Sequence, residues 1–135
     1  MAQLSHYHTE MVTGFATLVE NKDGSTGGHI KRTSKYVELL SEELRRRGCY
    51  KDILTKDYLN NLYKSAPMHD IGKIGVPDTI INKRDKLTDS EYEAIRQHPE
   101  IGSDILKTIE EIPDIMTGAR WHHERYDGHG YPDGL

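Results

Sequence analysis

The chain has 135 residues, which suffices for a single domain with one hydrophobic core. Charged residues make up 30% of it, and no apolar run approaches the roughly 18 residues of a membrane span, which excludes membrane insertion at this level. The net charge is −4 and the basic residues form no stripe, which argues against a nucleic-acid polymer as partner. Cys49 is the only cysteine, so an internal disulfide is excluded; with no signal-peptide pattern at the start, a cytoplasmic location is expected.

The first half of the chain is expected to form three helices. Residues 2–22 read as an amphipathic helix, because apolar residues recur at intervals of three and four, namely Leu4, Tyr7, Met11, Phe15 and Leu18. After a break of turn formers over 23–28, a second helix is marked by Ile30, Val37, Leu40 and Leu44 and stops at Gly48. Thr55 is a plausible N-cap for a third helix, which Pro67 bends and which closes at His69-Asp70.

The second half is expected to hold a buried loop, two more helices and a turn-rich end. Residues 71–81 contain two glycines, a proline and branched apolar residues, and are predicted to form the buried loop. The capping-box pattern from Thr88 to Glu91 opens a fourth helix that extends to Ile109. Pro113 suits the first turn of a fifth helix ending at Trp121. With no strand alternation, the predicted class is all-α, a helical bundle.

Five histidines stand where predicted helices meet breaks: His29, His69, His98, His122 and His123. The intervals of 40, 29 and 24 residues are about one helix-loop-helix each, so the side chains can meet inside a bundle. Five imidazoles exceed what one catalytic zinc usually holds, which indicates at least two metals with Asp70 as a bridge. Two metals roughly 3.5–4 Å apart are a common device for hydrolysing phosphate esters, and Lys73 adds a cation suited to a phosphate oxygen.

Four motifs together resemble the HD-GYP family, a cyclic di-GMP phosphodiesterase branch of the HD-domain metal-dependent phosphohydrolases. They are GGHIKR at 27–32, HDIGKIGVPD at 69–78, HPEIG at 98–102 and HHERYDGHGYPDGL at 122–135. The resemblance runs from about residue 16 to the last residue. It implies a helical bundle of the HD-domain type that binds two or three divalent metals, usually iron or manganese, with zinc, nickel or magnesium as further candidates.

The implied reaction is hydrolysis of cyclic di-GMP to linear pGpG or to GMP by a hydroxide bridging the metals. By motif, His29, His69 and Asp70 would serve one metal, with Asp70 bridging, and a second metal would be served by His98, His122 and His123. Lys73 would contact the scissile phosphate. The loop of Gly130, Tyr131 and Pro132 is the family's signature, implicated in ligand recognition or in contact with partner domains.

The chain departs from the family pattern at two places. Members with a third metal carry a carboxylate four residues before the first histidine, where this chain has Ser25, so a two-metal site is expected. The family pattern also continues past the Gly-Tyr-Pro loop with a helix whose aspartate completes the first metal's ligands. Residues 1–135 are therefore expected to be one domain truncated after the loop, with the C-terminal helices missing.

Two other functions remain open at this level. One is an HD-class phosphohydrolase acting on another nucleotide or cyclic dinucleotide. The other is a catalytically silent module that binds cyclic di-GMP or docks on a signalling-domain partner or a second copy. Glu124, Arg125 and Asp127 are interpreted as residues that brace the Gly-Tyr-Pro loop rather than as ligands.

Overall fold

The computed structural model describes residues 2–22, 28–108 and 115–135, apart from the side chains of residues 2–9 and 12. Over these ranges the chain is helical and contains no strand, which confirms the all-α prediction. The elements are α1 (Ala2–Lys22), α2 (His29–Arg46), α3 (Lys56–Ser65), the 3₁₀ helices η1 (Ala66–Met68) and η2 (Ile71–Gly75), α4 (Asp78–Ile81), α5 (Asp89–Arg96), α6 (His98–Leu106) and α7 (Ile115–Trp121).

The predicted helix boundaries are confirmed where side chains or glycine define them. Thr55 caps α3, with its hydroxyl accepting a hydrogen bond from the Tyr58 N–H at 3.2 Å. Thr88 and Glu91 form the reciprocal capping box at the start of α5. Gly48 lies just past α2 with φ 75°, a left-handed conformation that glycine adopts without strain.

Two predicted elements are wrong in form. The segment 71–81 is not a loop: it holds η2 and the short helix α4. The predicted fourth helix is two helices, α5 and α6, with Gln97 between them. Pro99 accounts for the break, because it has no N–H to donate to Ile95 and its ring would clash with that carbonyl. Ile109 and Pro113 lie outside the described residues.

The core lies where α6, α7 and η2 meet the inner sides of α1 and α2. Its buried residues are Ala16, Val19, Ile30, Met68, Ile71, Leu106, Ile115 and Ala119. The predicted apolar face of α1 is not the buried one: Met11, Phe15 and Leu18 are more than half exposed. Ala16 and Val19 are buried instead, because α1 packs on η1 and η2 and small side chains allow that approach.

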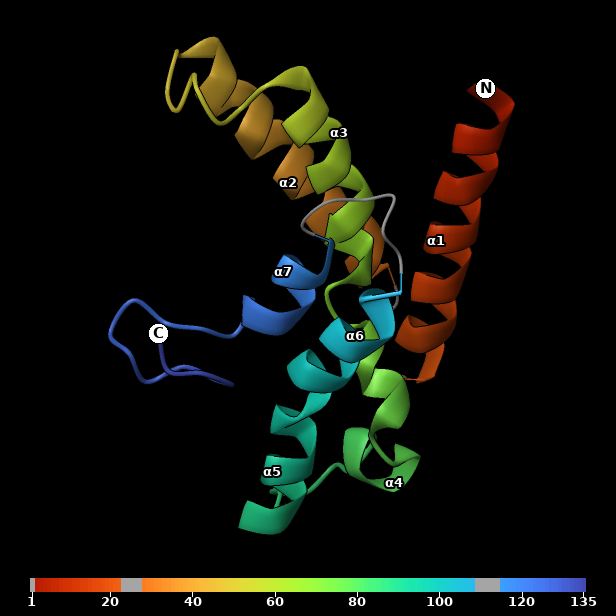
Figure 1. The fold of residues 1–135 in the computed structure, drawn as a ribbon. Coiled ribbons are helices and arrows are strands. Elements are labelled where there is room, and N and C mark those ends of the chain that lie inside the picture. Colours follow the sequence, from red (N-terminus) through yellow and green to blue (C-terminus); the bar gives the residue numbers. More distant parts are fainter. Residues whose placement is uncertain (1, 23–27, 109–114) are drawn as a thin grey trace.

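This packing brings the ends of distant segments to one place. Figure 1 shows α2 and α3 running side by side and α1 standing beside them, with α6 and α7 below the base of α3. α6 packs mainly against η2 and α7. The start of α2, the turn between η1 and η2, the start of α6 and the end of α7 therefore surround one point. No helix in the described ranges is long and apolar enough to cross a membrane.

Candidate metal centre

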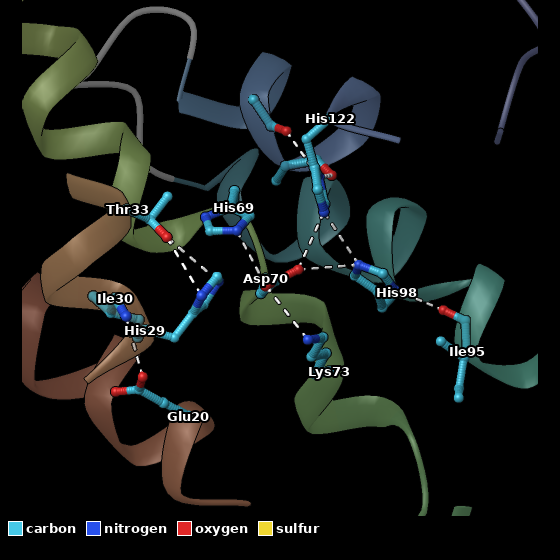
Figure 2. Close-up of polar contacts among 12 residues, drawn as sticks. Glu20, His29, Ile30, Thr33, His69, Asp70, Lys73, Ile95, His98 and His122 are labelled. Carbon is cyan, nitrogen blue, oxygen red and sulfur yellow. Dashed lines mark hydrogen bonds and ion pairs between the residues drawn. The ribbon is translucent and has the colours of Figure 1, made fainter. Parts of the chain in front are cut away.

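Asp70 lies at the centre of the histidine cluster, in the turn between η1 and η2. Its Oδ1 is 3.2 Å from His98 Nε2 and 3.1 Å from His122 Nε2. Its Oδ2 is 3.1 Å from His69 Nε2 and 3.4 Å from Lys73 Nζ. Figure 2 shows the side chains of His69, Lys73, His98 and His122, which come from segments far apart in the sequence, pointing toward the one carboxylate.

Three of the histidines are oriented by carbonyl groups at helix ends. The Nδ1–H of His69 donates to Ala66 O at 2.6 Å, and that of His98 donates to Ile95 O, also at 2.6 Å. His122 Nδ1–H lies 3.0 Å from Ala119 O. The last carbonyls of a helix lack an N–H partner within it, so a histidine just beyond the end can supply one. These bonds assign the proton to Nδ1 and leave the Nε2 lone pair directed inward.

The inward-facing atoms form a compact set of electron-pair donors. His98 Nε2 and His122 Nε2 lie 3.2 Å apart, and both are within 3.2 Å of Asp70 Oδ1. With both ring protons on Nδ1, neither Nε2 has a hydrogen to share with the other or with the carboxylate. Lone pairs this close repel one another unless a positive ion lies between them. These Nε2 and Oδ1 atoms are therefore a suitable set of ligands for a divalent metal.

The described His and Asp residues divide into two groups that share Asp70. One contains Asp70, His98, His122 and His123, and the other contains His29, His69 and Asp70. Within each group, one ligand atom per residue can be chosen so that all lie within 4.8 Å of one another. The structure thus brings together all six residues predicted to bind metal, in the expected division. Cys49 belongs to neither group.

His29 is placed by the start of α2. Gly28, with φ 79°, turns the chain into the helix, and the N–H of Ile30 donates to Glu20 Oε1 at 3.1 Å. Glu20 on α1 therefore fixes the end of α2 that carries His29, which sequence spacing alone did not predict. Ser25, the residue in place of the third-metal carboxylate, lies outside the described residues.

His123 connects the metal-binding group to the Gly-Tyr-Pro loop. Its ring stacks on Tyr131, with centroids 4.7 Å apart and planes at 14°. Both residues line a cleft of about 470 Å³, together with His122, Tyr92 and Arg96. This volume is in the range of small-molecule sites, and His122 and His123 of the first candidate group lie in its wall. Arg96 is a wall residue that the motif reading did not single out.

The electrostatics favour an ionised carboxylate at Asp70 and a neutral imidazole at His123, while, against the opposing effect of burial, the Asp70 carboxylate raises the pKa of His69. Burial opposes ionisation of Asp70, but His122, His69 and His98, where their rings also carry a proton on Nε2, donate hydrogen bonds that hold the pKa of its carboxyl well below the ordinary value. Burial, reinforced by the charges of His122 and His98, lowers the pKa of His123 to about 4. A neutral imidazole is the form that binds a metal, so His123 is already in that form at neutral pH.

The Gly-Tyr-Pro loop is held by the carboxylate of Glu124. Its Oε1 accepts from the backbone N–H of Asp133 at 2.6 Å and of Gly134 at 3.1 Å, and Oε2 accepts from Leu135 at 2.9 Å. A side chain at Gly130 would clash with backbone, coming 2.5 Å from His123 O, so the loop packs directly on the chain that carries the histidines. The bracing role predicted for Glu124 is confirmed.

The other two bracing residues act more locally. Arg125 Nη2 pairs with Asp127 Oδ2 at 2.6 Å, and Asp127 Oδ1 accepts from the His129 N–H. Asp133 also connects the loop to α7, which the sequence did not suggest. Its carboxylate accepts hydrogen bonds from Arg120 and from the indole N–H of Trp121 at the end of that helix.

Comparisons with known proteins place this helical site in a family. A model described as "HD domain" matches residues 16–135. A cyclic di-GMP phosphodiesterase of Vibrio cholerae is 41% identical over 128 residues, 90% of this chain and 26% of that protein. The cyclic di-GMP phosphodiesterase response regulator RpfG of Xanthomonas campestris is 35% identical over all of this chain and 34% of its own. A 3'3'-cGAMP-specific phosphodiesterase 2 of Vibrio cholerae is 31% identical over all of this chain and 25% of its own.

The chain therefore spans about a quarter to a third of the length of these relatives. The family model covers most of the chain, including every residue of the two candidate metal-binding groups. The relatives bear the HD-GYP resemblance out, and the chain belongs to the HD-domain family.

Proposed function

We propose that this chain is the hydrolytic domain of a metal-dependent phosphodiesterase whose substrate is cyclic di-GMP. The single observation that carries the proposal is the position of Asp70, whose carboxylate belongs to both metal-binding groups. A carboxylate shared by two imidazole-rich groups is the arrangement that holds two divalent ions close together. Relatives named as cyclic di-GMP phosphodiesterases support this choice of substrate.

In this proposal Asp70 would serve as a ligand to both ions, and the imidazoles of the two groups would complete the two sites. His29 and His69 would hold one ion, and the other would be held by His98, His122 and His123. Imidazole and carboxylate without thiolate suit iron or manganese, and also zinc or nickel. Bound there, such ions would polarise a phosphate oxygen and lower the pKa of a water.

The chain's own residues would position the substrate. Lys73 Nζ lies 3.4 Å from Asp70 Oδ2 and its side chain is one quarter exposed, so it can also pair with an oxygen of the scissile phosphate. Tyr131, stacked on His123, presents an aromatic surface at the edge of the cleft. The Glu124 bonds would keep this surface in place while the substrate binds.

A test of this function compares the chain with one aspartate variant. The chain is loaded anaerobically with Fe²⁺ or Mn²⁺ and given cyclic di-GMP, and pGpG and GMP are separated by chromatography. Asp70→Ala should lower both the bound metal and the rate, the rate by about 10³-fold or more, because both ions lose a ligand. Asp104→Ala, an exposed aspartate on α6, is the matched control and should retain parent activity.

Two outcomes would contradict the proposal. If Asp70→Ala hydrolyses cyclic di-GMP as fast as the parent, the bridging role is wrong. If the loaded parent chain holds metal but produces neither product, a silent binding module is the better description. The 3'3'-cGAMP-specific relative makes that cyclic dinucleotide the second candidate substrate, and the same assay with it separates the two.

A further inference from the structure

Arg96 is the feature of the cleft that the metal chemistry leaves unexplained. It is the last residue of α5, two positions before His98, and its side chain lines the cleft beside His122 and His123. Its guanidinium carbon lies 4.9 Å from the centre of the Tyr131 ring and 5.9 Å from that of Tyr92. Contacts with aromatic rings orient a guanidinium plane while its edge still carries N–H donors.

A purely structural role accounts poorly for this placement. A cation at the end of a helix is favoured by the helix dipole, and Arg96 has a carboxylate, Glu93, one turn earlier. The two groups are 3.8 Å apart, however, which is too long for a hydrogen bond. Glu93 is 63% exposed and Arg96 37%, and pairs this exposed contribute little to stability.

The other arginine on the cleft wall is engaged elsewhere. Arg125 also lines the cleft, but its Nη2 is 2.6 Å from Asp127 Oδ2. Arg96 thus combines a position on the cleft wall with an ion pair that leaves its hydrogen-bonding edge unsatisfied by Glu93. A guanidinium edge matches two oxygens of one phosphate group, and such paired bonds are among the stronger ones in proteins.

The metal centre can bind only one of the two phosphates of the proposed substrate at a time. A cyclic dinucleotide carries two phosphodiester groups, and only one can lie at Asp70 and Lys73 during a hydrolytic step. The other keeps a negative charge that needs a partner when it leaves water. Arg96 lines the same cleft as His122, whose Nε2 lies 3.1 Å from Asp70 Oδ1, so a ligand that contacts Arg96 in the cleft also lies beside the metal centre.

We propose that Arg96 binds the phosphate of the cyclic dinucleotide that is not being hydrolysed, with Tyr131 and Tyr92 orienting its guanidinium. This assignment rests on the proposed function, because it presumes a substrate with two phosphates. It makes Arg96 a residue that selects cyclic dinucleotides over phosphodiesters with a single phosphate. The guanidinium could instead read the edge of a guanine base, and the experiment below separates the two.

The test measures hydrolysis by the metal-loaded chain and its Arg96→Ala variant. With cyclic di-GMP, the variant should show KM raised about tenfold or more, with kcat within about twofold. With linear GpG, which keeps both guanines but has one phosphodiester, parent and variant should have the same kcat/KM. For Arg96→Lys, KM for cyclic di-GMP should lie between those of the parent and Arg96→Ala, since lysine keeps the positive charge but lacks the paired N–H donors of a guanidinium. Arg45→Ala, on α2 at the far end of the bundle, is the control and should change nothing.

The remaining outcomes each give a decision. An unchanged KM for cyclic di-GMP overturns the assignment, and an equal loss with GpG shows that Arg96 reads a base or supports the centre. If the parent hydrolyses bis(4-nitrophenyl) phosphate but no cyclic dinucleotide, the proposed substrate fails by itself. The Arg96 assignment is then decided by calorimetric binding of cyclic di-GMP to parent and variant. A parent chain that neither binds nor hydrolyses cyclic di-GMP overturns both.

Discussion

At the scale of single residues, the site depends on where protons are placed. His69, His98 and His122 each give the Nδ1 proton to a carbonyl at a helix end, so each has a lone pair on Nε2 facing Asp70. Each helix end thus gains a side-chain donor to one of its last carbonyls, and the centre gains an oriented ligand. A histidine at a helix break is therefore favoured for a second reason besides its spacing. The helix end supplies a backbone carbonyl that accepts the Nδ1–H and fixes the orientation of the ring.

Glu124 is the residue whose replacement tests the loop beside this centre. Its two carboxylate oxygens accept three backbone N–H groups, from Asp133, Gly134 and Leu135. Glu124→Gln keeps the size but removes the charge and turns one acceptor into a donor. We expect amide hydrogen exchange at these three residues to become about tenfold faster, since bonds to charged groups contribute more than neutral ones. Hydrogen exchange followed by mass spectrometry or NMR measures this.

The matched control for that experiment is Asp104→Asn on α6. This change also converts a carboxylate to an amide, but Asp104 is exposed and pairs with Lys107, the residue just past the end of α6. Exchange at residues 133–135 should stay at the parent rate in the control. Parent-like exchange in Glu124→Gln would mean that the loop is held by Asp133 and its contacts with Arg120 and Trp121 instead.

At the scale of elements, the placement of the site depends on a close contact between η2 and α6. A side chain at Gly72 would overlap the carbonyl oxygen of His98 and come 2.6 Å from Gly102 N. Both neighbours are backbone at the start of a buried helix, so they cannot turn aside. This contact sets the distance between Asp70, which precedes η2, and His98, which opens α6.

Gly72→Ala should therefore destabilise the fold and disturb the centre together. We expect the free energy of unfolding to fall by about 2–3 kcal/mol, the usual cost of overpacking a well-filled site. Urea unfolding followed by circular dichroism measures it. Gly14→Ala on α1 is the matched control: no described atom lies within 4 Å of the new methyl group, and alanine is the better helix former, so stability should not decrease. If both variants unfold alike, the η2–α6 contact is looser than described.

The comparison of sequence and structure also belongs to this scale. Caps could be predicted because Thr55, Thr88 and Gly48 act through their own neighbours. The grouping of the candidate metal ligands could be predicted because the motif residues lie at helix ends that a bundle brings together. The buried face of α1 could not, because tertiary contacts with η1 and η2 bury Ala16 and Val19 and leave the larger Phe15 outside. The position of Arg96 in the cleft could not be predicted, because it depends on a contact with the ring of Tyr131, 35 positions later in the sequence.

At the scale of the whole molecule, the candidate ligands come from segments with little else in common. α2 supplies His29, the turn around η1 and η2 supplies His69 and Asp70, and α6 supplies His98. His122 and His123 follow α7 directly. Ions bound at this centre would therefore tie together most of the bundle. The unfolded chain cannot hold these residues in place, so metal affinity and fold stability should be coupled.

Removal of metal tests this coupling without reference to catalysis. Metal at about 100 times its dissociation constant should add about 2.7 kcal/mol to stability, which for a chain of this size raises Tm by about 10 °C. We expect that rise in Tm with Mn²⁺ and its loss on adding a chelator, with Asp70→Ala showing little response. Mg²⁺ at the same concentration is the control, since it prefers oxygen ligands in octahedral geometry and should raise Tm much less. Equal Tm values with and without Mn²⁺ would mean that the histidines are not joined by metal in the folded state, and the two-metal proposal would lose its thermodynamic support.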